Sequence, residues 1–276
     1  MRVLTIRTGV GTRAARIEGD AAVELPYDDV GALLASGDDW AGANGPHHAV
    51  DRLDIAPLVV NPSKVICLGL NYRAHIEEMG HDLPAHPTLF AKFARALTGA
   101  RDAIPLPAGA TQVDWEAELA FVIGRAARNA RPDDAAAAIA GFTVLNDISM
   151  RDWQWRTSEW LQGKTFERST PVGPVLVTPD EVGGVAPDLV VTCEVDGELM
   201  QEARTSDLLF GPAAIVSYVS SIVTLDPGDL ISTGTPGGVG AGRLPPTFLR
   251  PGQVVRTAIT GIGELVNECV PERPST

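Results

Sequence analysis

Short apolar runs separated by turn-forming residues make up most of the second half of the chain, and this pattern constrains the fold more than any other feature. Runs of four to eight apolar residues bounded by Gly, Pro, Asn or Asp are typical of β-strands. Helical patterns interrupt them at about 132–140 and 212–222, without the regular strand–helix alternation of a dinucleotide-binding sheet. The sequence EVDGEL (194–199) predicts a hairpin that turns at its Asp-Gly pair. We therefore predict a mainly β, mixed α+β body. Its predicted strands are 115–123, 141–147, 173–177, 189–195, 229–233 and 253–260.

The N-terminal segment has a pattern of its own. RVLTIR, RAARIE and AAVEL are short strand candidates, and DDVGALLAS after them has helical character. Prolines at 57 and 62 then mark the crossing into a new unit, because Pro interrupts both helices and strands. We predict a small N-terminal α/β domain over residues 1–57 and a larger domain over residues 58–276.

Charge and composition limit the partners of the chain. The formal net charge of -13 argues against binding to nucleic acid or to an anionic membrane surface, since both need basic patches. The N-terminus lacks the pattern of a signal peptide, and no apolar run approaches the ~18 residues of a membrane helix. The cysteines are few, far apart and odd in number, which does not suggest zinc or redox chemistry. We predict a soluble, cytoplasmic protein, and its net charge does not exclude an anionic small substrate. Its cysteines are Cys67, Cys193 and Cys269.

The stretch DWEAELAFVIG (114–124) places two carboxylates at the entrance to a buried strand. Successive side chains of a strand point to opposite faces, so Glu116 and Glu118 share one face. Burying two like charges without compensation is costly. Either this end of the strand lies in water, or a positive group lies between the two glutamates. The predicted faces are Glu116, Glu118, Ala120 and Val122 on one side and Trp115, Ala117, Leu119 and Phe121 on the other.

A third carboxylate, Asp147, ends the apolar run GFTVLND (141–147). Three carboxylates without thiols or a histidine cluster suit a hard cation, Mg²⁺ or Mn²⁺. The alternative is that Glu116 and Glu118 form a solvated strand end and that Asp147 caps the next helix. Spacing alone favours this alternative, because such carboxylate pairs are common.

His75 and Glu78 lie in NYRAHIEE, where helical i, i+3 spacing places them on one face. A carboxylate beside an imidazole orients the ring and raises its basicity, so the pair could act as a general base toward water. The alternative is an ordinary surface ion pair. Glu77 lies on a different face, and we predict that it is solvated.

Two further segments carry chemistry. Lys164, between glycine and an apolar aromatic in LQGKTF, could point inward to neutralise a carboxylate or stabilise an enolate; the alternative is an exposed lysine. The glycine-rich segment ISTGTPGGVGAG (231–242) lacks the Lys-Ser/Thr that a phosphate-binding loop needs. Its backbone amides could still bind a carboxylate, and a loop without a ligand is the alternative.

Taken in order, these segments resemble the fumarylacetoacetate hydrolase family over residues 63 to about 268. The resemblance implies the rolled mixed β-sandwich of that family, usually as a homodimer, with a small variable N-terminal domain. The segments that carry it are SKVICLGLNYRAHIEE, DWEAELAFVIG, GFTVLNDISMRDWQ, GKTF, PVGPVLVT, LISTGTPGGVG and GIGELVNE.

The resemblance also implies roles for individual residues. The family's metal ligands for Mg²⁺ or Mn²⁺ match Glu116, Glu118 and Asp147, and its active-site lysine matches Lys164. Its water-activating pair matches His75 and Glu78, on a helix that forms a lid with the loop after it, here 75–87. The positions that bind the 2-oxo acid end of the substrate match Arg151, Gln154, Gly234 and Thr235. Small departures from the family pattern occur at Met150, at Glu167 and in the segment 79–87, and they leave the substrate open.

Three functions remain open from the sequence. The leading hypothesis is a metal-dependent hydrolase that cleaves a C–C bond in an acylpyruvate or related diketo acid, in the catabolism of aromatics or sugar acids. The alternative is an oxaloacetate-type decarboxylase or a 2-hydroxy-diene-dioate isomerase that uses the same metal site. The least favoured hypothesis is a scaffold that binds a ligand without turning it over.

Overall fold

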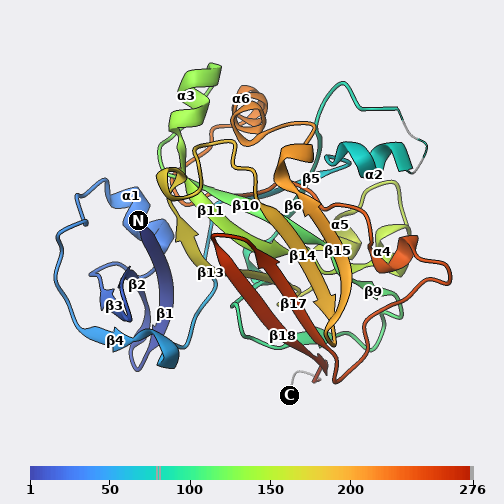
Figure 1. The fold of residues 1–276 in the computed structure, drawn as a ribbon, viewed down its shortest axis with the longest axis horizontal. Helices are drawn as coiled ribbons and strands as arrows, with labels where there is room; N and C mark the ends of the chain where they lie inside the picture. The colour runs from blue at the N-terminus through green and yellow to red at the C-terminus, as the bar shows by residue number, and fades with distance from the viewer. Residues whose placement is uncertain (79, 81, 274–276) are drawn as a thin grey trace.

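Three antiparallel or mixed sheets build the protein in a computed structural model that describes residues 1–78, 80 and 82–273 (Figure 1). The main sheet has eleven strands in the order β4-β3-β2-β1-β13-β11-β10-β16-β5-β6, with β7 beside β13. A second sheet has the order β15-β14-β17-β18-β8, and β12 pairs with β9. The predicted mainly β, α+β class is confirmed. The strands are β1 Arg2–Thr8, β2 Gly11–Glu18, β3 Ala21–Glu24, β4 His47–Ala49, β5 Val65–Gly69, β6 Thr88–Lys92, β7 Leu97–Thr98, β8 Ile104–Leu106, β9 Val113–Asp114, β10 Ala117–Ile123, β11 Ile139–Asn146, β12 Ser149–Met150, β13 Thr170–Val177, β14 Val190–Val195, β15 Glu198–Arg204, β16 Leu230–Ser232, β17 Val254–Ile259 and β18 Gly263–Pro271.

The helices are short and lie at the margins of the sheets (Figure 1). The predicted helix at 212–222 is confirmed as α6, in which Pro212 occupies the first turn, where its missing N–H costs no hydrogen bond. The helix predicted at 132–140 is shorter, because β11 already begins at Ile139. The α-helices are α1 Val30–Ser36, α2 Arg73–Glu78, α3 Pro132–Ala137, α4 Arg151–Gln154, α5 Leu161–Lys164 and α6 Pro212–Ile222, and the 3₁₀ helices are η1 Val50–Arg52, η2 Ala94–Ala96, η3 Pro179–Glu181, η4 Thr205–Asp207 and η5 Gly240–Gly242.

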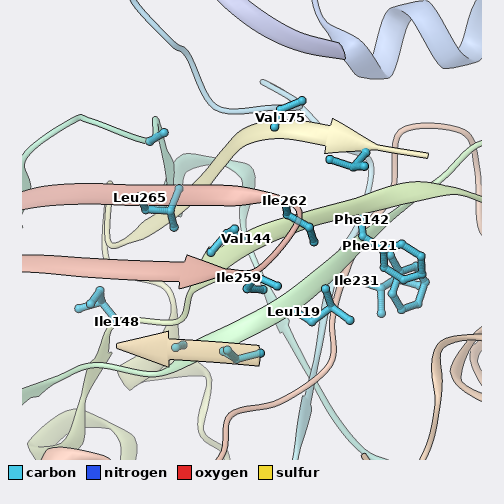
Figure 2. Packing of buried hydrophobic residues seen from close by; sticks show 14 of the residues in the cluster. Leu119, Phe121, Phe142, Val144, Ile148, Val175, Ile231, Ile259, Ile262 and Leu265 are labelled. Carbon is cyan, nitrogen blue, oxygen red and sulfur yellow. The ribbon is translucent and has the colours of Figure 1, made fainter. Parts of the chain in front are cut away.

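The hairpin predicted at EVDGEL joins β14 to β15. Asp196 and Gly197 both have positive φ, 52° and 81°, as the type I′ turn of a two-residue hairpin requires. This hairpin forms the edge of the second sheet, which packs on the main sheet through a shared apolar core (Figure 2).

Strand β10 lies at the centre of the main sheet between β11 and β16, and both of its faces are buried. Leu119 and Phe121 point into the core between the two sheets, beside Phe142 and Ile231 (Figure 2). The opposite face belongs to a second apolar cluster, which contains Ala120 and Val122. The predicted partition of the two faces is therefore confirmed, although the strand begins at Ala117 and leaves Trp115 and Glu116 in the connection from β9.

The N-terminal segment extends the main sheet at one edge (Figure 1). Strand β1 pairs with β13 through two residue pairs, Arg2 with Val177 and Val3 with Leu176. The sheet is thus continuous across the predicted boundary at residue 57, and the division into two domains stays a prediction.

An ion pair fastens this segment to the rest of the chain and gives a testable prediction. Asp102 accepts hydrogen bonds from Arg7 Nη2 (2.6 Å), Gly99 N (2.8 Å) and Thr98 Oγ1 (3.0 Å). Burial opposes the charge, but the hydrogen bonds from Arg7, Gly99 and Thr98 and the charge of Arg7 together outweigh burial and lower the pKa of Asp102. Because the folded pKa of Asp102 is depressed, its carboxylate stabilises the fold above the ordinary pKa of 3.8. This stabilisation is lost as pH falls through the pKa of the folded state.

Replacement of Asp102 by asparagine should lower the free energy of unfolding by about 1 kcal/mol at neutral pH, and the difference should shrink below pH 3.8. Denaturant titrations at several pH values measure it. The control is Asp54→Asn, since Asp54 binds the same arginine (2.7 Å) but its side chain is 66% exposed. Equal losses in both variants would contradict a special role for the Asp102 pair.

Candidate metal centre

Three carboxylates meet where β10 begins and β11 ends. Carboxylate oxygens of Glu116, Glu118 and Asp147 all lie within 4.8 Å of one another, and the three residues are buried. Antiparallel pairing produces this meeting, since Ala117 lies opposite Asn146 and the Asp147 amide donates to the Glu116 carbonyl (2.9 Å). The alternative of a solvated strand end is wrong for these residues. Asp147 does not cap α4 either, because that helix has Met150 at its N-cap.

Two buried lysines lie against this group and compensate part of its negative charge. Lys164 Nζ donates to Glu116 Oε2 (2.6 Å) and to Asp147 Oδ2 (3.0 Å), so the predicted inward lysine is confirmed. Lys92 Nζ lies 2.6 Å from Asp147 Oδ1 and also donates to the Lys164 carbonyl. Burial disfavours the Asp147 carboxylate, but Lys164 and Lys92 outweigh burial and lower its pKa. Burial likewise opposes the Lys164 ammonium, yet Asp147 and Glu116 raise its pKa.

Arg151 and Asp114 complete the centre. Arg151 donates through Nε (2.9 Å) and Nη2 (2.8 Å) to Asp114 Oδ2, and its Nη1 lies 2.7 Å from Glu116 Oε1. Asp114 also accepts from the amides of Gly240 (2.6 Å) and Ala241 (3.0 Å). The glycine-rich loop therefore binds a carboxylate, as the sequence suggested it could, and that carboxylate belongs to the chain itself. A side chain at Gly240 would place Cβ 1.9 Å from a backbone oxygen, which explains the glycine.

Glu118 is the carboxylate with an unused oxygen. Its Oε2 accepts from the Ser232 hydroxyl and from the Gly234 amide (2.9 Å), while Oε1 is buried without a hydrogen-bond partner among the described residues. Burial, followed by the charges of Asp147 and Glu116, raises the pKa of Glu118 to about 8. A proton on Glu118 thus balances the charge of the metal-free centre.

This arrangement fits a divalent cation. With all groups ionised, four carboxylates face three cations, which leaves one excess negative charge for a metal to neutralise. The carboxylates are Asp114, Glu116, Glu118 and Asp147, and the cations are Lys92, Arg151 and Lys164. The donors are oxygens only, the preference of hard cations such as Mg²⁺ and Mn²⁺, and the free oxygen of Glu118 offers a ligand atom. The centre could therefore hold a metal ion in place of the Glu118 proton.

A cavity of about 820 Å³ opens onto the centre. Its wall contains Glu116 and Lys164 together with the aromatic residues Phe90, Trp155 and Trp160. A pocket of this size accommodates a small organic acid. The predicted site residues in the same wall are His75, Arg151, Gln154 and Thr235.

The predicted substrate-binding residues differ in their contacts. Gln154 accepts from Arg151 Nη1 (2.9 Å), and Thr235 accepts from Gln201 Nε2 (2.8 Å). Gly234 directs its amide to Glu118 and is not part of the cavity wall. Substrate contacts of these residues stay predictions.

Helix α2 brings His75 to the wall of the cavity, where the imidazole is half-buried. Glu77 is exposed, as predicted. The side chain of Glu78, like Met79 and His81 of the predicted lid, lies outside the described residues. The water-activating pair and the lid therefore stay predictions.

Comparison with known proteins now decides the family. The family described as "Fumarylacetoacetate (FAA) hydrolase C-terminal" matches residues 64–270, which include every residue of the centre. The chain belongs to the fumarylacetoacetate hydrolase family. As in the prediction from sequence, the match begins beyond the N-terminal strands.

The chain is similar to proteins described as a tautomerase, a hydrolase and an isomerase. The mitochondrial oxaloacetate tautomerase fahd2 of Xenopus laevis is 43% identical over 227 residues, covering 81% of this chain and 71% of that protein. A fumarylacetoacetate hydrolase from Exiguobacterium antarcticum is 32% identical with a TM-score of 0.88, covering 99% and 100% of the two chains. A 2-hydroxyhepta-2,4-diene-1,7-dioate isomerase from Mycobacterium marinum is 32% identical with a TM-score of 0.79, covering 99% of each chain.

No helix among the described residues is long and apolar enough to cross a membrane. The Xenopus relative is described as mitochondrial, whereas the sequence led us to expect a cytoplasmic location. The compartment of this chain stays a prediction.

Proposed function

We propose that this protein is a Mg²⁺- or Mn²⁺-dependent enzyme that interconverts the keto and enol forms of a 2-oxo dicarboxylic acid of the oxaloacetate type. The observation that carries the proposal is a cavity whose wall combines the carboxylate–lysine centre with one imidazole. The oxaloacetate tautomerase and the dienedioate isomerase among its relatives support the same class of reaction. The proposal replaces C–C hydrolysis, the leading hypothesis from sequence, with a reaction close to its alternative, which named decarboxylation of an oxaloacetate-type acid or isomerisation of a 2-hydroxy-diene-dioate.

The residues of the chain have separate tasks in this reaction. A bound divalent cation would supply electrophilic stabilisation of negative charge on the 2-oxo oxygen. Lys164 adds a buried positive charge at the cavity wall, and Arg151 fixes the orientation of Glu116. His75 would take a proton from C3 of the keto acid, and return of that proton from the imidazolium to the C2 oxygen would complete the enol. Phe90, Trp155 and Trp160 give the cavity an aromatic wall beside these groups.

Product analysis tests the proposal, because hydrolysis, decarboxylation and tautomerisation pass through a common enolate but give different products. The protein would be mixed with freshly dissolved enol-oxaloacetate, and the loss of enol absorbance followed with Mg²⁺ and with excess chelator. We expect metal-dependent ketonisation faster than pyruvate release. Cleavage of an acylpyruvate without ketonisation would instead establish a hydrolase, and pyruvate and CO₂ as primary products a decarboxylase.

His75→Ala should lower kcat for tautomerisation roughly 10²- to 10⁴-fold, the usual contribution of a positioned acid–base group. Binding of Mg²⁺ and oxalate should persist, because His75 is not among the clustered carboxylates. Stopped-flow absorbance and calorimetry give the two readouts. His47→Ala, at an exposed histidine of β4, is the control. Unchanged turnover in His75→Ala would remove this residue from the reaction.

A further inference from the structure

Arg243 is a cation of the cavity wall that the metal centre does not use. Arg151 and Lys164, the other arginine and lysine in the wall, are paired with buried carboxylates. In the part of the chain that the structure describes, Arg243 has no carboxylate within ion-pair distance, and its guanidinium contacts only neutral groups. A permanent positive charge that faces a cavity and has no protein anion beside it is suited to bind an anion of the ligand.

The hydrogen bonding of Arg243 leaves donors for such an anion. Its Nη2 donates to the Met200 carbonyl (3.1 Å), and its Cζ lies 5.9 Å from the centroid of the Trp115 ring. Its Nε is buried and has no hydrogen-bond partner among the described residues. A guanidinium with unused N–H groups gains from a carboxylate that accepts from those facing the cavity, and the partnerless Nε leaves its hydrogen-bonding capacity further unsatisfied.

The loop that carries Arg243 is fixed to the metal centre. The Arg243 amide donates to the Gly240 carbonyl (3.2 Å), and the Gly240 amide donates to Asp114, the partner of Arg151. Trp115 Nε1 donates to the Gly238 carbonyl (3.2 Å) and holds the start of the same turn. The fold therefore fixes the backbone that carries Arg243 relative to the centre, and the bond to the Met200 carbonyl holds the guanidinium. A fixed distance between the two ends of a site allows it to select ligands by length.

We propose that Arg243 binds the distal carboxylate of the substrate, so that the site selects 2-oxo dicarboxylates over 2-oxo monocarboxylates. The inference rests on the proposed function, in which the 2-oxo acid end of the substrate lies at the metal centre. Arg243 is a specificity-determining residue in this scheme and takes no part in proton transfer.

Two ligands separate the two ends of the site. Oxalate can occupy only the chelating end, whereas 2-oxoglutarate adds a distal carboxylate. Calorimetry on the Mg²⁺-loaded protein should show that Arg243→Met weakens 2-oxoglutarate binding about 10- to 100-fold and leaves oxalate binding within about twofold. Arg243→Lys should recover part of the loss. For oxaloacetate, KM should rise by a similar factor while kcat changes little.

Arg250→Met is the matched control, since Arg250 is an exposed arginine seven residues along the same connection and not part of the cavity wall. The unaltered protein gives a second test that no folding defect can disturb. It should bind 2-oxoglutarate more tightly than the 5-methyl ester of that acid, and Arg243→Met should bind the two alike. Equal affinity of the unaltered protein for acid and ester would overturn the inference, and so would a parallel loss of oxalate and 2-oxoglutarate binding in Arg243→Met.

These readouts are independent of turnover. Discrimination between acid and ester without ketonisation of oxaloacetate would support the role of Arg243 and contradict the proposed function. Ketonisation without discrimination would support the function and contradict the role of Arg243.

Discussion

Replacement of Glu118 by glutamine is expected to stabilise the metal-free protein while abolishing its response to Mg²⁺. Burial and the neighbouring charges of Asp147 and Glu116 raise the pKa of Glu118 from 4.5 to about 8. At neutral pH the folded protein must keep this group protonated, whereas the unfolded chain ionises it. The free energy of unfolding is therefore lowered as pH rises above 4.5, and this cost levels off above about pH 8. At pH 7 it is roughly 3 kcal/mol.

Glutamine removes this cost and keeps the local hydrogen bonds. Its carbonyl oxygen can still accept from Ser232 and Gly234, and its amide group replaces the unused oxygen beside the other carboxylates. We expect Glu118→Gln to raise the melting temperature at pH 8, to leave it unchanged at pH 4, and to eliminate the increase caused by Mg²⁺. Turnover should fall by roughly three orders of magnitude or more, because a neutral amide is a poor metal ligand.

Thermal melts across pH, with and without Mg²⁺, provide the measurement. Glu264→Gln is the control, since Glu264 forms an exposed ion pair with Arg256 on the second sheet, away from the centre. A Glu118→Gln protein that still gains stability from Mg²⁺ would place the metal elsewhere.

The second large effect is expected at Lys92, the buried lysine that the sequence pattern did not reveal. Lys92→Met removes the ammonium 2.6 Å from Asp147 Oδ1 and leaves Lys164 to compensate a fully buried carboxylate. Breaking a buried ion pair costs about 3–5 kcal/mol, because the remaining charge stays out of water. A divalent cation at the centre would supply the missing positive charge, so Mg²⁺ should stabilise Lys92→Met more than it stabilises the unaltered protein.

Urea denaturation with and without Mg²⁺ measures both parts of this prediction. The control is Lys64→Met. It removes a lysine that pairs with Asp226 (2.8 Å) and Asp229 (2.9 Å), neither of which belongs to the metal centre. The stability lost in that control should not depend on Mg²⁺. An equal Mg²⁺ effect in Lys92→Met and in the unaltered protein would contradict a cation site beside Asp147.

The sequence was sufficient for the faces of β10, because they follow from a local pattern, whereas the inward position of Lys164 was expected from the family resemblance and not from its neighbours in sequence. Alternating apolar residues specify which positions share a face, and Leu119 and Phe121 do lie opposite Ala120 and Val122. The preference for a solvated carboxylate pair was wrong, since spacing cannot reveal that β10 begins inside the sandwich. Only the register of Ala117 against Asn146 brings Glu118 and Asp147 together.

Lys92 and Asp114 could not have been found from the chain alone. Lys92 ends a short edge strand, and its partner Asp147 is 55 positions away, so no local spacing connects them. Asp114 precedes the carboxylate motif as an ordinary acidic residue, and its partners are the amides of a loop that begins more than a hundred residues later. Pairing of this kind is set by sheet register, which a single sequence does not encode in any local pattern.

The burial of lysine at the centre also determines how the surface can be modified. The chain contains three lysines among its 22 basic residues, and two of them are enclosed against Asp147. Acylating agents need an accessible, uncharged amine. Burial opposes the ammonium form of Lys64 and Lys164, but neighbouring carboxylates outweigh burial and raise the pKa of both lysines. These carboxylates are Asp226 and Asp229 for Lys64, and Asp147 and Glu116 for Lys164. Arginine supplies nearly all of the exterior positive charge, so acetyl or ubiquitin attachment to side chains has little to act on in the native fold.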